Sequence, residues 1–204
     1  MRALAILPVK NLQRAKTRLS TVLSKSERKM LVLNLFLRTG RLCQRAGFKV
    51  LSLTPDDTVA EISLRMGWLV FREDFNNLNK ALANVFKSFS NVPLLIVLPD
   101  LPLLSLDALE TVHMLGRRYG CVICPDLRLK GTNMLYLDGA GFFKPMFGSG
   151  SFQRHLNQLR KRSAVKVFVK LETALDLDSP EDLLLLSRLS FSLPVYGKKG
   201  RYQD

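Results

Sequence analysis

Short apolar segments alternate with helical patterns along the whole chain of 204 residues. Seven of these segments have the length of strands, and several are too continuously apolar to leave one face in water. The predicted strands are residues 3–7, 48–54, 68–71, 94–98, 121–124, 133–137 and 165–169. The pattern therefore favours strands that are covered on both faces.

Helix signals fill the intervals between these strands. Ser24 and Glu27 have the spacing of a capping box, and they precede an apolar pattern of helical period between Met30 and Leu42. Further helices are predicted over residues 76–89, after Ser105, from 151 to about 162, and after Ser179-Pro180. Repetition of strand, helix and strand implies right-handed crossovers between neighbouring parallel strands.

The order of these elements predicts the fold class and the place of the site. We expect an α/β protein with a doubly wound, mostly parallel sheet, formed as a single domain over residues 1–204 with a basic C-terminal tail at 191–204. In such sheets ligands bind beyond the carboxyl ends of the strands. Candidate chemistry is therefore sought where the strands end.

The composition is that of a globular protein with a full core, with 47% hydrophobic and 24% charged residues. No segment approaches the roughly 18 apolar residues of a membrane span, and the three cysteines are too few for a disulfide framework. Cys121 and Cys124 lie within an apolar run and are predicted to be core thiols. A cytoplasmic protein without a membrane partner is expected.

Charge is distributed unevenly along the chain. Residues 1–50 contain 12 basic side chains and one acid, whereas the other 154 residues contain 19 basic and 16 acidic side chains. The N-terminal part is therefore expected to face an anionic group, which could be a polyphosphate, a nucleic acid or an acidic membrane surface.

The basic loop after the first strand is the first candidate site. Lys10, Arg14, Lys16 and Arg18 fall within nine positions at the expected ligand edge. The loop lacks the glycines and the GK[ST] ending of a Walker loop, so side-chain cations rather than backbone N–H groups would hold phosphates. The alternative interpretation is a solvated basic loop.

Acidic residues follow two of the predicted buried segments. Asp100 comes directly after the strand at 94–98 with a proline on its N-terminal side, and its carboxylate suits Mg²⁺. Asp176 and Asp178 alternate with leucines, so an extended backbone would present both carboxylates on one side, where they favour a cation between them. The alternatives are a turn-forming role for Asp100 and a helix-capping role for Asp178.

Two glycine-containing segments could bind an anion. Thr132 follows Gly131 before a strand, and residues 147–152 precede a helix, where free backbone N–H groups attract phosphate or carboxylate. The alternative is a plain turn followed by a helix cap. His155 lies four residues after Ser151 on the same helix face, and a structural role for it is favoured over a role in the site.

These motifs occur together in an order that resembles the 2-phospho-L-lactate guanylyltransferase family. The matching residues are Pro8–Lys10, Ala15–Leu19, Leu78-Asn79, Asp100–Leu104, Gly131–Asn133, Phe147–Phe152 with His155, and Asp176–Leu183. The resemblance implies a nucleotidyltransferase fold of the glycosyltransferase-A-like, Rossmann-like kind. It also implies that GTP and 2-phospho-L-lactate give lactyl-2-diphospho-5'-guanosine and pyrophosphate in coenzyme F420 biosynthesis. Members of the family use phosphoenolpyruvate, and some use 3-phosphoglycerate.

The resemblance also implies roles for individual residues. Asp100, Asp176 and Asp178 would hold Mg²⁺; Thr132, Gly148 and Ser151 would bind the phosphorylated acid; and Lys16 would contact phosphate. Lys10 and Arg18 are expected to join Lys16 on the nucleotide phosphates, and Asn79 is expected near the base. A homodimer is plausible from the family. Because the acceptor phosphate is itself ionised, no general base is needed.

Two rival functions share parts of this pattern. Nucleotidyltransferases that act on sugar phosphates or molybdopterin usually begin with a glycine-rich loop, and Pro8–Lys10 stands in its place here. A nucleic-acid-binding module is suggested by two basic clusters, Arg160–Arg162 and Lys198–Arg201. Aromatic residues are not interleaved with these basic side chains, so no nucleic-acid partner is expected.

Overall fold

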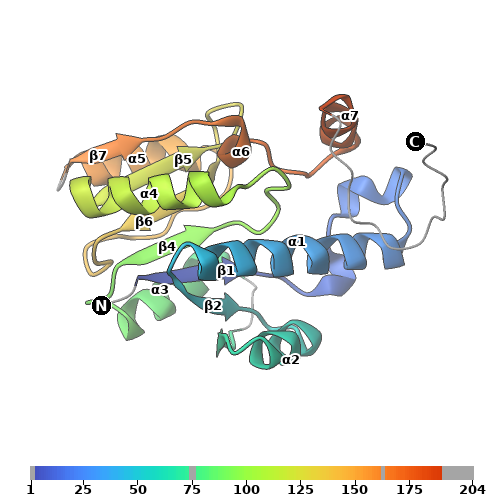
Figure 1. Ribbon diagram of the computed structural model, residues 1–204, viewed down its shortest axis with the longest axis horizontal. Helices are drawn as coiled ribbons and strands as arrows, with labels where there is room; N and C mark the ends of the chain where they lie inside the picture. The colour runs from blue at the N-terminus through green and yellow to red at the C-terminus, as the bar shows by residue number, and fades with distance from the viewer. Residues whose placement is uncertain (1–2, 74–76, 162–163, 190–204) are drawn as a thin grey trace.

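The computed structural model describes residues 3–73, 77–161 and 164–189, and its strands form one sheet with helices on both faces (Figure 1). The order across the sheet is β3-β2-β1-β4-β6-β5-β7. The strands are β1 (Leu4–Pro8), β2 (Lys49–Leu53), β3 (Leu69–Phe71), β4 (Leu94–Val97), β5 (Cys121–Pro125), β6 (Thr132–Leu137) and β7 (Val165–Val167). All seven predicted strands are confirmed, with ends that differ by at most two residues.

One strand, β6, runs against the others. β1 pairs in parallel with β2 and β4, whereas β6 pairs antiparallel with both β4 and β5. The first residues of β6 therefore lie at the edge where the parallel strands end, and the N–H of Leu98 donates to the carbonyl of Asn133 there over 3.0 Å. This reversal places Thr132 at the ligand-binding edge of the sheet.

The helices are α1 (Lys25–Arg45), α2 (Asp57–Arg65), α3 (Leu78–Ser88), α4 (Leu106–Tyr119), α5 (Ser151–Arg160), α6 (Leu171–Ala174) and α7 (Pro180–Arg188). The capping box of Ser24 and Glu27 at the start of α1 is confirmed. Helix α2 was not predicted, although Asp56 caps it by accepting from the N–H groups of Thr58 and Val59. In the described residues, no helix is long and apolar enough to cross a bilayer.

Alternate residues of each strand pack on opposite faces of the sheet, as a doubly wound fold requires. Ala5 and Leu7 face a core formed with α1, α2 and α4. Leu4 and Ile6 face a second core formed with α3 and α5. All three cysteines are buried in these cores, which confirms the predicted role of Cys121 and Cys124 as core thiols.

A third, smaller core lies outside the sheet and joins residues 19–35 to residues 175–186. It is made of Leu19, Leu31, Leu35, Leu175, Leu177 and Leu186. These leucines come from the short 3-10 helix η2 (Thr17–Thr21), the first turns of α1, the segment before α7, and α7 itself. Figure 1 shows α7 and the start of α1 at the same end of the molecule. This core fixes the basic loop against the segment that carries Asp176 and Asp178.

Helix α1 approaches Trp68 so closely that only glycine fits at residue 40. A Cβ atom on Gly40 would lie 2.1 Å from Cη2 of the buried Trp68 ring. We expect Gly40→Ala to lower the free energy of unfolding by about 1–3 kcal/mol, because the packed ring has little room to move. Urea denaturation measures the loss. Gly141→Ala is the control, since nothing lies within 4 Å of its added Cβ; equal stability of the two variants would contradict the expected clash.

Candidate functional site

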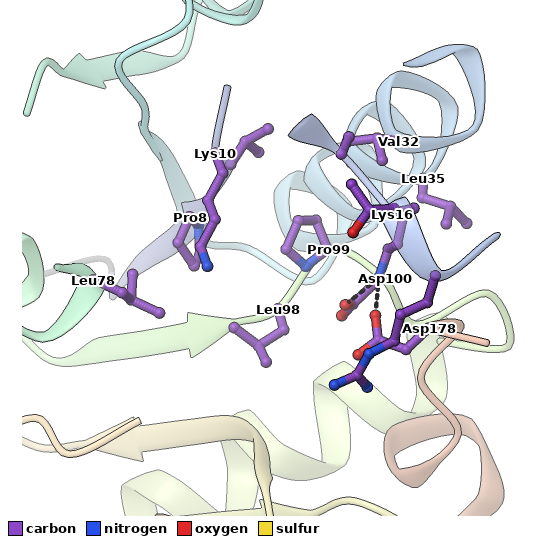
Figure 2. Close-up of a pocket in the computed structure, with 14 residues that line it drawn as sticks. Pro8, Lys10, Lys16, Val32, Leu35, Leu78, Leu98, Pro99, Asp100 and Asp178 are labelled. Carbon is purple, nitrogen blue, oxygen red and sulfur yellow. Dashed lines mark hydrogen bonds and ion pairs between the residues drawn. The ribbon is translucent and has the colours of Figure 1, made fainter. Parts of the chain in front are cut away.

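A cavity of about 360 Å³ opens at the carboxyl edge of the sheet, beyond β1 and β4 (Figure 2). The charged residues that line it are Lys10, Lys16, Arg18, Asp100 and Asp178. These side chains come from three separate parts of the sequence, and all five were predicted to belong to the site. The fold thus brings the basic loop and two of the three predicted acids to one place.

The loop that carries Lys16 is built from two short 3-10 helices, η1 (Leu12–Arg14) and η2. The carboxylate of Asp56 accepts from the N–H of Leu12 over 2.9 Å and so anchors the loop to the cap of α2. Between the two helices, Lys16 has a left-handed backbone with φ 47° and ψ 47°, a conformation that is unfavourable for a residue with a side chain. Together with buried Leu19, this turn directs the Lys16 side chain inward.

Lys16 links two of the predicted acids directly. Its Nζ lies 2.7 Å from Oδ2 of Asp100 and 2.5 Å from Oδ1 of Asp178, and its side chain is only 11% exposed. Burial by itself lowers the pKa of Lys16, but the two carboxylates outweigh burial and hold the pKa above its usual value. The ammonium is therefore charged at neutral pH.

Asp100 is placed by the end of β4 and by a bond to the C-terminal segment. Its backbone carbonyl accepts from the N–H of Leu177 over 3.0 Å, which pins the two acidic segments together. One carboxylate oxygen accepts from Lys16, whereas the other, Oδ1, is buried and has no hydrogen-bond partner among the described residues. Asp100 does not serve as a turn cap, and its second oxygen is available to a ligand.

The alternation predicted before α7 is confirmed. Leu175 and Leu177 are buried in the third core, while Asp176 and Asp178 are only partly buried. The capping alternative for Asp178 is wrong, because the carboxylate of Asp182 accepts from the N–H groups of residues 178 and 179 over 2.9 and 2.7 Å. The Asp178 carboxylate is thus left to Lys16.

Asp176 completes the acidic group without touching Lys16 in an ion pair. Burial, with smaller contributions from the negative charges of Asp100 and Asp178, raises its pKa to about 6. Three carboxylates and one ammonium leave a formal excess of two negative charges when all are ionised. Repulsion among these carboxylates adds to burial in raising the pKa of Asp176.

This donor set fits a hard divalent cation. Carboxylate oxygens are the ligands that Mg²⁺ prefers, one or two from protein are usual, and substrate phosphates supply others. The unpartnered Oδ1 of Asp100 and the excess negative charge both favour such an ion. Within the described ranges, no three Asp, Glu, His or Cys side chains are arranged as a ready-made metal site. The ammonium of Lys16 lies between two of the three candidate ligands.

The residues assigned to the phosphorylated acid form a separate, buried network. The Oγ of Ser151 donates to Oγ1 of Thr132 over 3.3 Å, and Nδ1 of His155 lies 3.0 Å from the same oxygen. The N–H of Met146 donates to Nε2 of His155 over 2.9 Å, so Nδ1 of the neutral ring holds the proton and donates to Thr132. Neither hydroxyl lines the cavity beside Lys16.

The glycine-rich turn before α5 differs from its prediction in one respect. Gly148 and Gly150 both have positive φ, at 115° and 72°, as the turn requires. The N–H groups of Ser151 and Phe152 were expected to be free for an anion, but they donate to the carbonyls of Gly148 and Lys130. One of these donors is therefore satisfied by a carbonyl within the turn, and the other by a carbonyl of a neighbouring loop.

Asn79 holds this turn from the other side. Its Nδ2 donates to the carbonyl of Phe147 over 3.1 Å, and its Oδ1 accepts from the N–H of Phe147 over 2.6 Å. Both ends of the amide are therefore used to position the turn that contains Gly148. Contact between Asn79 and a nucleotide base stays a prediction.

His155 gives the protein a measurable pH dependence. The ring is fully buried, and burial, with a smaller contribution from the charge of Arg154, lowers its pKa to about 4 from an unfolded value near 6.5. The unfolded chain therefore binds a proton first as the pH falls, so stability is lost between pH 6.5 and pH 4. We expect the titration of this residue to lower the free energy of unfolding by about 2 kcal/mol when the pH falls from 7 to 5.

Urea denaturation of the wild type and of His155→Gln at both pH values isolates this effect. The variant has no imidazole to protonate, so its stability should fall less between the two pH values. Identical losses in both proteins would show that the ring is not the titrating group.

Some features of the site were not visible in the sequence, and some predicted basic residues lie outside the described part of the chain. Val32 and Leu35 of α1 and Leu78 of α3 form apolar walls of the cavity, but the helical period alone marks such residues only as core. None of the basic residues of α1, all of which lie in the described part of the chain, lines the cavity. Arg162 and the tail at 191–204 lie outside the described residues.

Comparison with known proteins identifies the family of the chain. The family model described as guanylyl transferase CofC-like matches residues 3–188. The phosphoenolpyruvate guanylyltransferase of Rubrobacter xylanophilus is 36% identical over 192 residues, which cover 91% of this chain and 94% of that protein. The 2-phospho-L-lactate guanylyltransferase of Methanocaldococcus infernus is 31% identical over 180 residues, which cover 87% and 81% of the two chains.

Solved structures share the fold at low sequence identity. A nucleotide-diphospho-sugar transferase candidate from Desulfovibrio desulfuricans G20 superposes with a TM-score of 0.78 at 16% identity, over 93% of this chain and 88% of that one. The expected fold class is thereby confirmed, and the family match extends from the first strand to the end of α7. The chain belongs to the CofC-like guanylyl transferase family, and it is a nucleotidyltransferase.

Proposed function

We propose that this protein transfers the guanylyl group of GTP to the phosphate of a three-carbon acid, with 2-phospho-L-lactate as the acceptor and phosphoenolpyruvate or 3-phosphoglycerate as the alternatives. The products are the acid linked through a diphosphate to guanosine, and pyrophosphate. The observation that carries the proposal is the contact of Lys16 with Asp100 and Asp178 at the carboxyl edge of the sheet, beside two further cations of the same cavity.

The reaction needs alignment and charge compensation rather than a general base. The second pKa of a phosphate monoester is near 6, so the attacking oxygen of the acceptor is mostly ionised at pH 7. This oxygen forms a bond to the α-phosphorus of GTP, the bridging bond to the β-phosphate breaks, and pyrophosphate leaves with the electron pair. Accordingly, none of the described residues that line the cavity is a histidine or a cysteine.

The cations of the cavity act on the triphosphate. Lys10, Lys16 and Arg18 bind its phosphate oxygens, and they stabilise the negative charge that accumulates on the departing pyrophosphate. Their positions on one loop align the leaving group with the incoming phosphate. Asp100, Asp176 and Asp178 would hold Mg²⁺, which when bound neutralises phosphate oxygens of both substrates.

The buried network at the start of β6 and α5 is proposed to orient the acid. Oγ1 of Thr132 accepts from His155 and from Ser151, so its own proton is not used in either bond. That hydroxyl proton can donate to a carboxylate or phosphate oxygen. Gly148 lies on the exposed part of the same turn, where its backbone can approach a ligand.

A coupled assay of pyrophosphate release tests this function. The protein is incubated with GTP, Mg²⁺ and one acceptor at a time: 2-phospho-L-lactate, phosphoenolpyruvate, 3-phosphoglycerate or glucose 1-phosphate. We expect release that depends on one of the three acids and that falls strongly when ATP replaces GTP. Release with the sugar phosphate alone, or with none of the acceptors, would overturn the proposal. Homodimerisation and a cytoplasmic location stay predictions.

A further inference from the structure

The ammonium of Lys16 has two possible sets of partners, the carboxylates of the site and the triphosphate of a nucleotide. The ammonium contacts Asp100 and Asp178, and the side chain is almost buried between them. Guanylyl transfer as proposed above needs the same ammonium on the triphosphate and the same carboxylates on a divalent cation. One ammonium cannot occupy both places at once.

We propose that Lys16 is a place-holder, whose ammonium occupies the position of the divalent cation until the cation displaces it. The destination of the ammonium, the phosphates of a bound nucleotide, rests on the proposed function. The competition between Lys16 and the cation does not, because it follows from the contacts of Lys16 alone.

The geometry of the group favours exclusive rather than joint occupancy of the position between Asp100 and Asp178, because the ammonium of Lys16 fills it. A divalent cation that binds Asp100 and Asp178 would lie next to the ammonium of Lys16, and two neighbouring cations repel each other strongly in a partly buried site. Without any cation, Asp100 and Asp178 would repel each other, because both carboxylates lie within 2.7 Å of the same Nζ atom. The group therefore holds one cation at a time at this position.

The loop that carries Lys16 is suited to release it. The left-handed backbone of Lys16 costs free energy, and a rearranged loop recovers that cost. The adjacent helices η1 and η2 span three and five residues, so few backbone hydrogen bonds hold the turn. In the described part of the chain, Lys10 and Arg18 of the same cavity have no ion-pair partner, which leaves them free to meet an incoming anion first.

The proposal predicts that removal of the ammonium strengthens binding of the bare ion. Mn²⁺ serves as the probe, because its free form gives a paramagnetic resonance signal that disappears on binding. In the absence of nucleotide, we expect the Kd of Lys16→Met for Mn²⁺ to be at least about tenfold lower than that of the wild type, since the ion no longer competes with a charge in direct contact with its ligands.

Lys10→Met is the matched control. It removes the same charge from the same cavity, but Lys10 contacts neither acid, so its Kd for Mn²⁺ should change less than about threefold. Adding Asp100→Asn to Lys16→Met should abolish the gain. A gain that survives this second change, or one that Lys10→Met reproduces in full, would show that the ion binds elsewhere or that only the general field matters, and would overturn the proposal.

A second measurement uses the wild type and does not depend on the stability of any variant. Acetylation of lysines by a water-soluble ester, followed by peptide mass spectrometry, reports how accessible each ammonium is. We expect Lys16 to react slowly in metal-free protein and at least about fivefold faster with saturating Mn²⁺, while Lys10 changes little, because displacement frees the Lys16 ammonium from its two carboxylates.

The outcomes separate this proposal from the proposed function. Unchanged Mn²⁺ affinity in folded Lys16→Met, or unchanged acetylation of Lys16 in the wild type, would overturn the place-holder whether or not guanylyl transfer is observed. Competition between Lys16 and Mn²⁺ in a protein that releases no pyrophosphate would support the place-holder and contradict the proposed function.

Discussion

Asp100→Asn is expected to lower the rate of guanylyl transfer by roughly 100-fold or more without unfolding the protein. The substitution keeps the size of the side chain and removes its charge, so the buried unpartnered oxygen becomes a poorer ligand or is replaced by an amide nitrogen. Asp178→Asn should have a similar effect, because it removes the other carboxylate that contacts Lys16. Steady-state rates of pyrophosphate release at saturating GTP and acid measure both.

The control for these variants is Asp107→Asn. Asp107 also forms an ion pair with a lysine, Lys170, but it lies on exposed surface and outside the cavity. Its substitution should leave the rate within about twofold of the wild type, as expected for a surface pair of little energetic consequence. Circular dichroism spectra verify that each protein is folded. Turnover close to that of the wild type in either Asp100→Asn or Asp178→Asn would remove both acids from the proposed metal site.

Lys16→Ala should mainly impair the use of GTP. Loss of the ammonium removes a contact to the triphosphate and a source of stabilisation for the leaving pyrophosphate, so we expect kcat/KM for GTP to fall by about 100-fold or more. The KM for the acid should change much less, because Thr132 and Ser151 lie in a separate network. Initial rates at varied GTP and varied acid give the two values independently.

Lys87→Ala provides the comparison for Lys16→Ala, since Lys87 is an exposed lysine in the last turn of α3 and does not line the cavity. It removes the same charge from the chain and should leave both KM values unchanged. If the KM for GTP and the rate of Lys16→Ala both match the wild type, Lys16 does not contact the nucleotide.

The local pattern of the sequence was sufficient where neighbouring residues determine the structure. The alternation of Leu175, Asp176, Leu177 and Asp178 predicts which side chains are buried, because an extended backbone leaves no other arrangement once the leucines enter a core. The capping box at Ser24 likewise fixes the start of α1 from residues three apart. In the same way, long apolar runs predict the central strands.

The arrangement of the site depends on contacts that no local pattern contains. Lys16 lies 84 positions from Asp100 and 162 positions from Asp178 along the chain, so a sequence shows that both charges exist but not that they meet. The reversal of β6 is similarly invisible, because a buried strand has the same apolar pattern in either direction. This reversal is what places Thr132 at the ligand edge.

The role of Asn79 illustrates a further limit. A short polar side chain at the start of a helix is typical of a cap, of a ligand contact or of a clamp on a distant loop, and only the fold chooses among them. Here the amide spans 68 positions to bind both backbone groups of Phe147. The sequence located the residue in the neighbourhood of the site, and the structure shows what it holds.

The most direct test of the site is a crystal structure of the wild type with Mn²⁺ and a GTP analogue that carries a methylene group between the α- and β-phosphates. An anomalous peak for Mn²⁺ should lie against the carboxylates of Asp100 and Asp178, with the α-phosphate on the ion and the ammonium of Lys16 on the triphosphate. A nucleotide bound outside this cavity, or Mn²⁺ bound away from both carboxylates, would contradict the proposed active site.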